Sequence, residues 1–430
     1  MSEVILGDCL EVMPGLEADS IDLICTDPPY GLKFMGKEWD HGVPGVAFWK
    51  EALRVAKPGA HLFAFGGTRT FHRLAVAIED AGWEIRDCVM WVYGSGFPKS
   101  LDVSKAIDKA AGAEREVVGQ KRAAIGIPGA RFPEEMKRVD ITAPATEAAK
   151  QWEGWGTALK PAWEPIILAR KPLIGTVAEN VLAHGTGGIN VDGCRVETDE
   201  KIKCTNGSKN EIYGNLSYIT GQPWELDHKG RWPANLIHDG SDEVVGLFPE
   251  GKSGGGRKDE LGKRNYIKTA KSNSLSGDRG GLGITGRLEY DEERDDYYTL
   301  GIKHTDSGSA ARFFYCAKAS PSERGKTNKH PTVKPLALMK YLITLGLPPG
   351  GTVLDPFAGS GTTALACKEL DRNYICIEKS SDYYQMILER ITEHELRSTC
   401  LIEAFTFKQH IPDEPIKKII DNSPLQLKLF

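Results

Sequence analysis

Short apolar runs alternate with stretches of helical periodicity over the N-terminal quarter of the chain. The runs IDLICT (21–26) and AHLFAFGG (60–67) have the length and continuous apolar character of buried strands. Each is followed by a stretch whose apolar residues share one helical face, at 48–59 and at 70–82. A further strand, with a bend, is predicted at 83–94. This alternation is typical of an α/β protein with a parallel sheet.

The same pattern returns near the C-terminus, after a long section of different composition. Residues of about 112–150 look like an insertion, and 160–172 predict one more strand. From about 175 to 315, Gly, Asn, Asp, Ser and Lys dominate and apolar runs are short. The sequence then predicts a helix, a strand, a Gly-led helix, a strand and a helix, at 335–346, 351–357, 359–371, 373–378 and 382–396. Neither half has enough strands for an ordinary nucleotide-binding sheet, so we expect one doubly wound, mostly parallel sheet assembled from both chain ends.

Composition excludes some classes of protein. The chain has 430 residues, 40% of them apolar, and lacks the ~20 consecutive apolar residues that a membrane helix needs. Its N-terminus does not read as a secretory signal, so we expect a cytoplasmic protein without a membrane partner. None of the nine cysteines forms a C-x-x-C pair, which argues against a zinc site, and we interpret them as reduced core residues.

The net charge of −5 does not indicate a nucleic-acid-binding protein, but DNA responds to the local field at a binding face. Residues 251–275 carry seven Lys or Arg and two acidic residues. This basic, Gly-rich stretch fits a DNA-facing loop and a solvated loop equally well.

The tetrapeptide Asp27-Pro28-Pro29-Tyr30 directly follows the first predicted strand. Ligands bind at the carboxyl ends of strands in an open α/β sheet. The two prolines remove two N–H donors, so the turn keeps only acceptors, which suits the amino group of a nucleobase. Tyr30 offers a ring face on which an unstacked base can lie. An ordinary Pro-Pro turn with a solvated Asp is the alternative interpretation.

A second motif, DPFAGSGTT at 355–363, stands between a predicted strand and a predicted helix. Its glycines, Gly359 and Gly361, allow the backbone to approach a ligand at a helix N-terminus. Glu378 ends the next strand about twenty residues on, where an acid can hold ribose hydroxyls. The third glycine of the dinucleotide pattern and the G-K-[ST] phosphate loop are missing, which favours a nucleoside without phosphates. A purely structural strand–helix turn is the alternative.

Together these motifs closely resemble the permuted (beta-group) amino-methyltransferases of DNA, which use S-adenosylmethionine. In that family the D-P-P-Y motif comes first, a target-recognition region follows, and an H-P-T-x-K-P segment leads into the D-P-F-x-G-x-G cofactor motif. Here HPTVKP (330–335) holds that place, and GDC (7–9) matches the pattern of a residue that contacts the adenine of the cofactor. The resemblance covers about 4–100, 160–172 and 312–395.

The resemblance implies a role for each motif residue. The catalytic set is Asp27, Pro28, Pro29 and Tyr30. Asp8 would bind the adenine and Glu378 the ribose of the cofactor, within a cofactor-binding set of Asp8, Thr332, Lys334, Asp355, Phe357, Gly359, Gly361 and Glu378. A surface charge is the alternative for Lys334. No metal is implied, and the absence of a Pro-Cys dipeptide argues against methylation at cytosine C5.

The implied function is transfer of a methyl group from S-adenosylmethionine to the N6 amino group of a flipped adenine in duplex DNA. The same reaction at cytosine N4 is the nearest alternative, although Asp27 as the first motif residue favours adenine. Methylation of RNA or of a protein amide, and a catalytically idle DNA-binding protein, are further alternatives. The resemblance leaves room for a homodimer and for a cognate restriction endonuclease, in a bacterial or phage-infected cell.

This interpretation divides the chain into four parts. They are a catalytic half with its insertion, a target-recognition region, a cofactor-binding half and a C-terminal tail, at 1–174, 175–310, 311–398 and 399–430. Methyl donor and amino group must meet at about 3–3.5 Å. We therefore expect GTVLD (351–355) to lie between NYICIE and IDLICT, with AHLFAF beyond IDLICT and the N-terminal VIL run beyond NYICIE.

Replacing three Lys or Arg residues within 251–275 should weaken DNA binding about equally on all sequences. It should also flatten the dependence of binding on salt, because phosphate contacts release counterions. Binding isotherms at a series of salt concentrations measure this slope. An unchanged slope would show that the stretch is a solvated loop.

Overall fold

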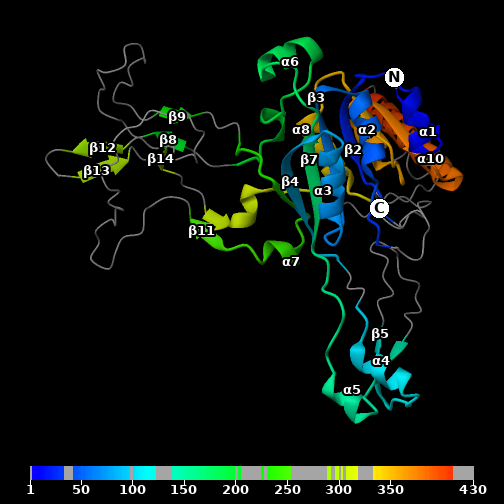
Figure 1. Cartoon of the computed structure of the whole chain (residues 1–430). Helices are drawn as coiled ribbons and strands as arrows, with labels where there is room; N and C mark the ends of the chain where they lie inside the picture. The colour runs from blue at the N-terminus through cyan, green and yellow to red at the C-terminus, as the bar shows by residue number, and fades with distance from the viewer. Residues whose placement is uncertain are drawn as a thin grey trace, which may run out of the picture.

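A nine-stranded sheet with helices on both faces forms the body of the protein (Figure 1). The computed structural model describes residues 2–32, 42–96, 100–122, 138–198, 202–204, 224–226, 230–252, 288–291, 296–299, 302–303, 307–317 and 333–409. Across the sheet the strands are β1 (Glu3–Leu6), β18 (Asn373–Glu378), β17 (Thr352–Asp355), β2 (Ile21–Thr26), β3 (Ala56–Phe65), β7 (Trp163–Arg170), β4 (Glu84–Val92), β10 (Leu236–His238) and β16 (Tyr315–Cys316). Only β7 runs antiparallel to its neighbours in this sheet.

The expected order of the strands is confirmed. β17 lies between β18 and β2, β3 lies beyond β2, and β1 lies beyond β18. The bend expected near 83–94 is a register shift between β4 and β7 at Ile85/Asp87. The second strand begins earlier than predicted, since β3 starts at Ala56, inside the stretch expected to be helical.

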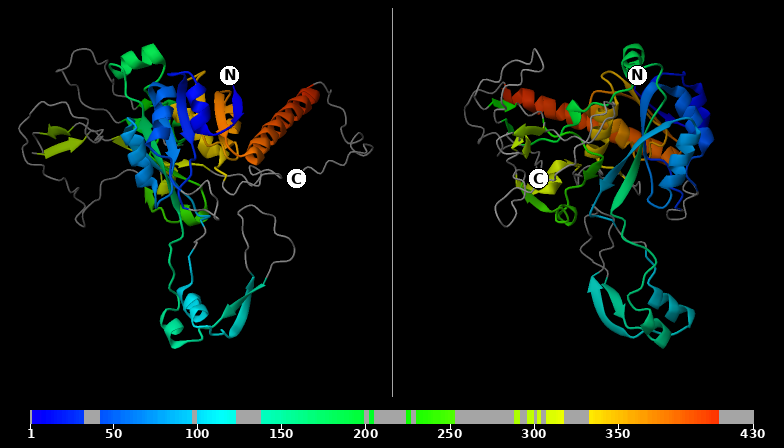
Figure 2. Two further views of the ribbon diagram at one scale, coloured as in Figure 1. Left: turned by 45° about the vertical axis from the view of Figure 1, so that its right-hand side comes forward. Right: turned by 60° about the vertical axis from the view of Figure 1, so that its left-hand side comes forward.

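Helices cover both faces of the sheet because its central strands are apolar on both sides. All six residues of β2 are buried, and their side chains alternate, with Leu23 and Cys25 in one core cluster and Ile24 in the other. One face carries α1 (Cys9–Val12), η1 (Met13–Gly15), α2 (Val46–Val55) and α3 (Phe71–Asp80). The other carries α8 (Leu336–Gly346), α9 (Thr362–Glu369) and the start of α10 (Ser381–Gln409). Figure 2 shows α10 running outward, beyond the end predicted at 396.

Asp22, a buried residue of β2, ties the two chain ends together at the start of their strands. Its carboxylate accepts a hydrogen bond from the Thr352 N–H of β17 at 2.8 Å and pairs with Lys57 Nζ of β3 at 2.6 Å. The backbone pairing of β2 with β17 is short, joining Val353 to Leu23 and Leu354 to Ile24. The side chain therefore reinforces a narrow junction.

The central section of the chain adds two strands to the far edge of the sheet, β10 and β16. It also contributes α6 (Val177–His184), whose buried Asn180 donates hydrogen bonds to the carbonyls of Pro58 and Thr186 at 2.9 and 2.8 Å. Strands this short have no readable periodicity, so the sequence did not predict them. The other described elements of the central section are η4 (Asp192–Cys194), β8 (Ile202–Cys204), β9 (Trp224–Leu226), α7 (Asp242–Val245), β11 (Glu250–Lys252), β12 (Leu288–Asp291), β13 (Asp296–Thr299), β14 (Ile302–Lys303), β15 (Ser307–Ser309) and η5 (Ala310–Phe313).

The insertion between β4 and β7 forms a separate lobe that projects away from the sheet (Figure 1). It consists of α4 (Val103–Ala110), β5 (Val117–Arg122), β6 (Arg138–Thr142) and α5 (Glu147–Gln151). β5 and β6 form an antiparallel pair, and a bridge between Asp102 and Gly156 closes the base of the lobe. Composition placed the start of the insertion at about residue 112. The lobe begins earlier, since α4 starts at Val103.

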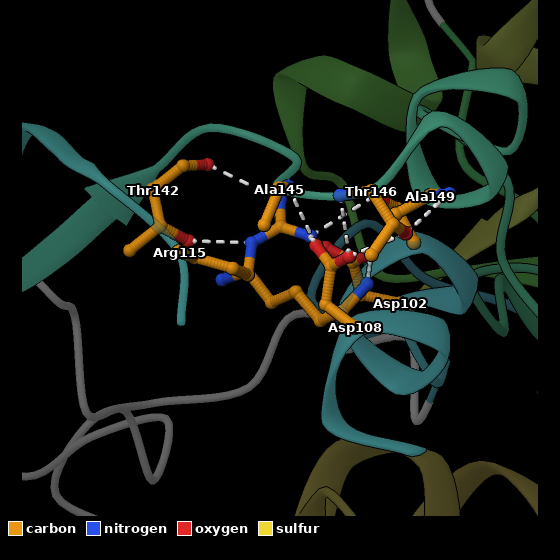
Figure 3. A network of polar contacts seen from close by, with 9 residues as sticks. Asp102, Asp108, Arg115, Thr142, Ala145, Thr146 and Ala149 are labelled. Carbon is orange, nitrogen blue, oxygen red and sulfur yellow. Dashed lines mark hydrogen bonds and ion pairs between the residues drawn. The ribbon is translucent and has the colours of Figure 1, made fainter. Parts of the chain in front are cut away.

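A buried carboxylate, that of Asp108 on α4, organises this lobe (Figure 3). Asp108 Oδ2 accepts from Arg115 Nη1 at 2.7 Å and from the Ala145 N–H at 2.9 Å. Its Oδ1 accepts from the N–H and the hydroxyl of Thr146 at 3.0 and 2.8 Å. Burial by itself raises the pKa of Asp108, but these hydrogen bonds and the charge of Arg115 outweigh it and bring the pKa to about 2.

Replacing Asp108 by Ala should loosen the lobe and leave the sheet intact. The substitution leaves two N–H groups and a guanidinium without their buried acceptor. Amide hydrogen exchange over 138–150 should accelerate, while exchange in β2 and β3 stays unchanged. Equal acceleration in both places would mean that the lobe does not unfold on its own.

Candidate active site

Both sequence motifs lie on the side of the sheet where the strands have their carboxyl ends, after β2 and β17. This side is called the carboxyl edge below. The Thr26 hydroxyl, at the end of β2, donates to Asp355 Oδ1, at the end of β17, across 2.7 Å. Asp27 follows Thr26 directly, so the two motif carboxylates belong to adjacent strand ends although 328 positions separate them in the chain (355 − 27). At the carboxyl edge, the acceptor-rich turn that begins at Asp27 therefore lies beside the Gly-rich turn that follows Asp355.

Asp27 belongs to a partly buried group of charged and polar side chains, within which Lys334 is buried. Tyr30 donates its hydroxyl to Asp27 Oδ1 at 2.8 Å. Lys334 Nζ lies 2.8 Å from Asp27 Oδ2, 3.1 Å from the Tyr30 hydroxyl and 3.1 Å from Glu164 Oε2. The Tyr30 hydroxyl is also 3.1 Å from Glu164 Oε2. Lys334, which has three N–H donors, thus finds three acceptors.

The two catalytic-motif prolines shape the turn that holds this group. Pro28 is buried and Pro29 is half-buried. Gly31 follows with φ of 67°, a value that favours glycine. The Thr70 hydroxyl, just before α3, donates to the Tyr30 carbonyl at 2.6 Å and fixes the end of the turn.

Burial and charge act in opposite directions on this group. Burial alone lowers the pKa of Lys334, but Asp27 and Glu164 outweigh it and raise the pKa above its usual value, so the ammonium stays charged. Burial also raises the pKa of Tyr30 well above its usual value, with the neighbouring carboxylates adding to the effect. Tyr30 therefore keeps its hydroxyl hydrogen.

The sequence did not single out Glu164. It lies on β7, in the predicted strand 160–172, and a signal was present as an acid at the start of an otherwise apolar run. Lys334 is only 8% exposed, so it is not a surface charge, and its ammonium lies at the Asp27 turn. Tyr93 of β4 adds an outer contact, with its hydroxyl 3.5 Å from Glu164 Oε1.

On the second motif, Asp355 is held from three sides. Besides the Thr26 contact, Asp355 Oδ2 accepts from the Thr363 hydroxyl of α9 at 2.5 Å, and Oδ1 accepts from the Phe357 N–H at 3.1 Å. Burial raises the pKa of Asp355 to about 6, against the lowering effect of these hydrogen bonds. The Phe357 ring packs against Phe48, with centroids 4.9 Å apart.

The Gly-rich turn itself depends on Glu378 at the end of β18. Gly359 and Gly361 adopt φ values of 53° and 74°, in the left-handed region. The Glu378 carboxylate accepts from the Gly359 N–H and from the Ser380 N–H, each at 2.8 Å. Burial raises the pKa of Glu378, while these N–H groups lower it. Glu378 thus couples the turn to the neighbouring strand.

Asp8 lies near this edge, at the N-cap of α1. It accepts from the Leu10 N–H at 2.9 Å and pairs with Lys379 at 2.9 Å. The hydrogen bond from Lys379, followed by that from Leu10, lowers the pKa of Asp8. Thr332 and the basic residues at 253–275 lie outside the described residues.

Metal-binding and membrane-spanning features are missing from the described part of the chain. No group of three or more His, Cys, Asp or Glu side chains in these ranges is placed to hold a metal ion. Within the same ranges no helix is long and apolar enough to cross a membrane. Cys25 and Cys376, interpreted as core residues, are fully buried.

The profile of a DNA methylase family, N6_N4_Mtase, matches residues 21–389 of the chain. The protein therefore belongs to this family, and the resemblance inferred from its motifs is confirmed. The Type II methyltransferase M.HindIII of Haemophilus influenzae is 22% identical, over 90% of this chain and 93% of the relative. The Type II methyltransferase M.SmaI of Serratia marcescens is 47% identical over 62 residues, which are 14% of this chain and 21% of the relative.

Two solved structures are similar over most of their length. The M1.HpyAVI–SAM complex has 18% identity, covers 91% of this chain and 99% of its own, and has a TM-score of 0.38. The cytosine-N4-specific PvuII DNA methyltransferase has 14% identity, covers 92% of each chain, and has a TM-score of 0.40.

The Asp355→Asn variant should reveal the buried charge through the pH dependence of stability. Since the pKa of Asp355 is raised to about 6, its contribution to stability is greatest below about pH 4 and is lost as pH rises through about 6. The stability of the wild type relative to the variant should fall over that interval by up to about 3 kcal/mol, from two pKa units at ~1.4 kcal/mol each. Denaturant unfolding of both proteins at several pH values measures it, and a constant difference would contradict the burial argument.

Proposed function

We propose that the protein is an S-adenosylmethionine-dependent methyltransferase that modifies the N6 amino group of a flipped adenine in duplex DNA. The observation that carries this proposal is the contact between Thr26 and Asp355. It joins the acceptor turn at Asp27 to the Gly-rich turn, so a target amino group and a methyl donor can meet at one edge. Membership of the DNA methylase family supports DNA as the substrate. A bacterial cytoplasm is the setting that fits relatives from Haemophilus and Serratia.

The side chains at the Gly-rich turn fit S-adenosylmethionine. Glu378 presents carboxylate oxygens with remaining lone pairs, which can accept from ribose hydroxyls. Asp8 can accept from an adenine amino group, while Asp355, Phe357, Gly359 and Gly361 would border the sugar and methionine parts. Thr332 stays a predicted member of this pocket. Lys334 instead has its described contacts with Asp27, Tyr30 and Glu164, so we assign it to the amino-group site.

At the other turn, chain residues orient the base. The ring of Tyr30 supports the flipped base, and Asp27 with the Pro28 carbonyl accepts the amino hydrogens. The bound donor supplies a methyl group whose bond to sulfur breaks, with the electron pair left on sulfur, as the bond to nitrogen forms. One hydrogen leaves the nitrogen as a proton, first to the Asp27 carboxylate and then to water. Positioning and charge complementarity account for the acceleration.

In the proposed reaction, DNA must reach the carboxyl ends of β2 and β17, and basic side chains lie near them. A cavity of about 350 Å³ is lined by Gly31, Leu32, Arg69, Thr70, His72 and Arg73, next to Tyr30. Arg69, His72 and Arg73 are exposed. The charges of Arg69 and Arg73 and their position beside the base-binding turn suit contacts with DNA phosphates.

Purified Asp27→Ala should lose methyl transfer and keep binding S-adenosylmethionine. The substitution removes the acceptor for the amino group, while Lys334 keeps its contact with Glu164, so the site stays folded. Transfer of labelled methyl groups to DNA, followed by nucleoside analysis, measures the activity and should yield N6-methyladenine. The converse variant, Gly359→Trp, should lose the cofactor, as calorimetry would show. Normal turnover by Asp27→Ala would refute the mechanism, and N4-methylcytosine as the product would establish the alternative base.

Replacing Arg69 and Arg73 by Gln should weaken DNA binding without regard to sequence. For each phosphate that the variant no longer neutralises, the slope of log K against log salt should become shallower by about 0.9. Arg86→Gln is the matched control. Arg86 lies near the start of β4, so it is at the end of the sheet opposite to the carboxyl ends of β2 and β17. Equal slopes for the double variant and the control would exclude this cavity from the DNA-binding face.

A further inference from the structure

We infer that Glu164 is a positioning residue for methyl transfer: it retains Lys334 and the Tyr30 hydroxyl when the amino group of the target base takes a place at Asp27. The inference rests on the proposed function. It concerns a residue of β7, a strand that pairs with β3 and β4, and this residue lies outside both sequence motifs.

Each oxygen of Asp27 already accepts one hydrogen bond in this structure. Oδ1 accepts from the Tyr30 hydroxyl and Oδ2 accepts from Lys334 Nζ, each across 2.8 Å. An amino group that donates to Asp27 must share an oxygen with one of these donors, and sharing weakens the hold of Asp27 on that donor. A donor that is displaced into a buried space without another acceptor would raise the free energy of the complex.

Glu164 supplies that other acceptor without large movements. Its Oε2 lies 3.1 Å from the Tyr30 oxygen, and a phenol has one hydrogen, so the hydroxyl can turn from Asp27 to Glu164 while its oxygen stays in place. The same Oε2 lies 3.1 Å from Lys334 Nζ, which can release Asp27 and remain paired. One carboxylate thus serves both displaced donors.

The net charge of the group also supports a positioning role for Glu164. Asp27, Glu164 and Lys334 together carry one negative charge when all three are ionised, which suits a nitrogen that becomes positive during transfer. Without Glu164 the group would be neutral, and Lys334 would be a buried ammonium whose one carboxylate partner is claimed by the substrate. Such an ion is costly to bury unpaired.

The surroundings of Lys334 define which groups can respond to pH. Among the described residues, the titratable groups that contact it are Asp27 and Tyr30, after β2, and Glu164, on β7. The Phe65 ring of β3 covers the ammonium at 4.9 Å from its centroid. Tyr93 of β4 stands behind Glu164.

The first test is Glu164→Gln, which keeps the shape of the side chain and removes its charge. The single-turnover rate of methyl transfer, from labelled S-adenosylmethionine to whole-genome-amplified bacterial DNA that carries no methylation, should fall by about tenfold or more. Calorimetric affinity for S-adenosylmethionine should stay near the wild-type value, because Glu164 does not contact the Gly-rich turn. Thermal unfolding of the variant, measured alongside, checks that it is folded at the assay temperature.

The second test distinguishes positioning from a structural role. In Glu164→Gln the transfer rate should rise from neutral to mildly alkaline pH more steeply than in the wild type, since a less well paired Lys334 loses its proton more readily. Adding Lys334→Met should remove this extra pH response and recover part of the rate, because the group regains one net negative charge and has no ammonium to pair.

Each outcome decides the matter. A wild-type rate in Glu164→Gln overturns the inference, while the wild-type activity upholds the proposed function. A loss that is equal at every pH and is not relieved by Lys334→Met shows a purely structural role and also overturns it. If the wild type transfers no methyl group to the DNA, the proposed function fails, and this inference fails with it.

Discussion

The arrangement of this protein depends on the junction between β2 and β17, where the two ends of the chain meet. Two backbone register pairs form it, and a buried side chain closes it at each end. Asp22 binds the Thr352 N–H at the start of the strands, and Thr26 binds Asp355 at their carboxyl ends. Because adjacent strands lie only about 4.8 Å apart, this junction fixes the distance between the two functional turns.

A second constraint is the buried ammonium of Lys334 beside that junction. Two carboxylates and one ammonium, from Asp27, Glu164 and Lys334, come from three separate parts of the chain. Buried ions persist where their partners are held in good geometry, and here a turn, a strand and the segment before α8 hold them. The group keeps an excess of negative charge at the place where the proposed reaction develops positive charge. The Gly-rich turn differs, since its carboxylates mainly bind backbone N–H groups and hydroxyls.

Much of the sheet could be predicted from the sequence because its strands are apolar on both faces. IDLICT and NYICIE read as buried strands, and the expected reaction required the strands before Asp27 and Asp355 to be neighbours, which predicted the observed strand order. Elements without such a signal were missed. β10 and β16 are three and two residues long, and β3 begins inside a stretch that looked helical.

The sequence by itself determined which residues form the two turns, since motif spacing, proline and glycine encode local backbone geometry. Only the tertiary structure decided how distant side chains meet. Glu164 is an ordinary acid in its own strand, and Lys334 could have been a surface lysine. Their pairing depends on β7 running antiparallel between β3 and β4 and on the segment before α8 reaching the end of β2. Such contacts arise from packing across the sheet, which local sequence patterns do not encode.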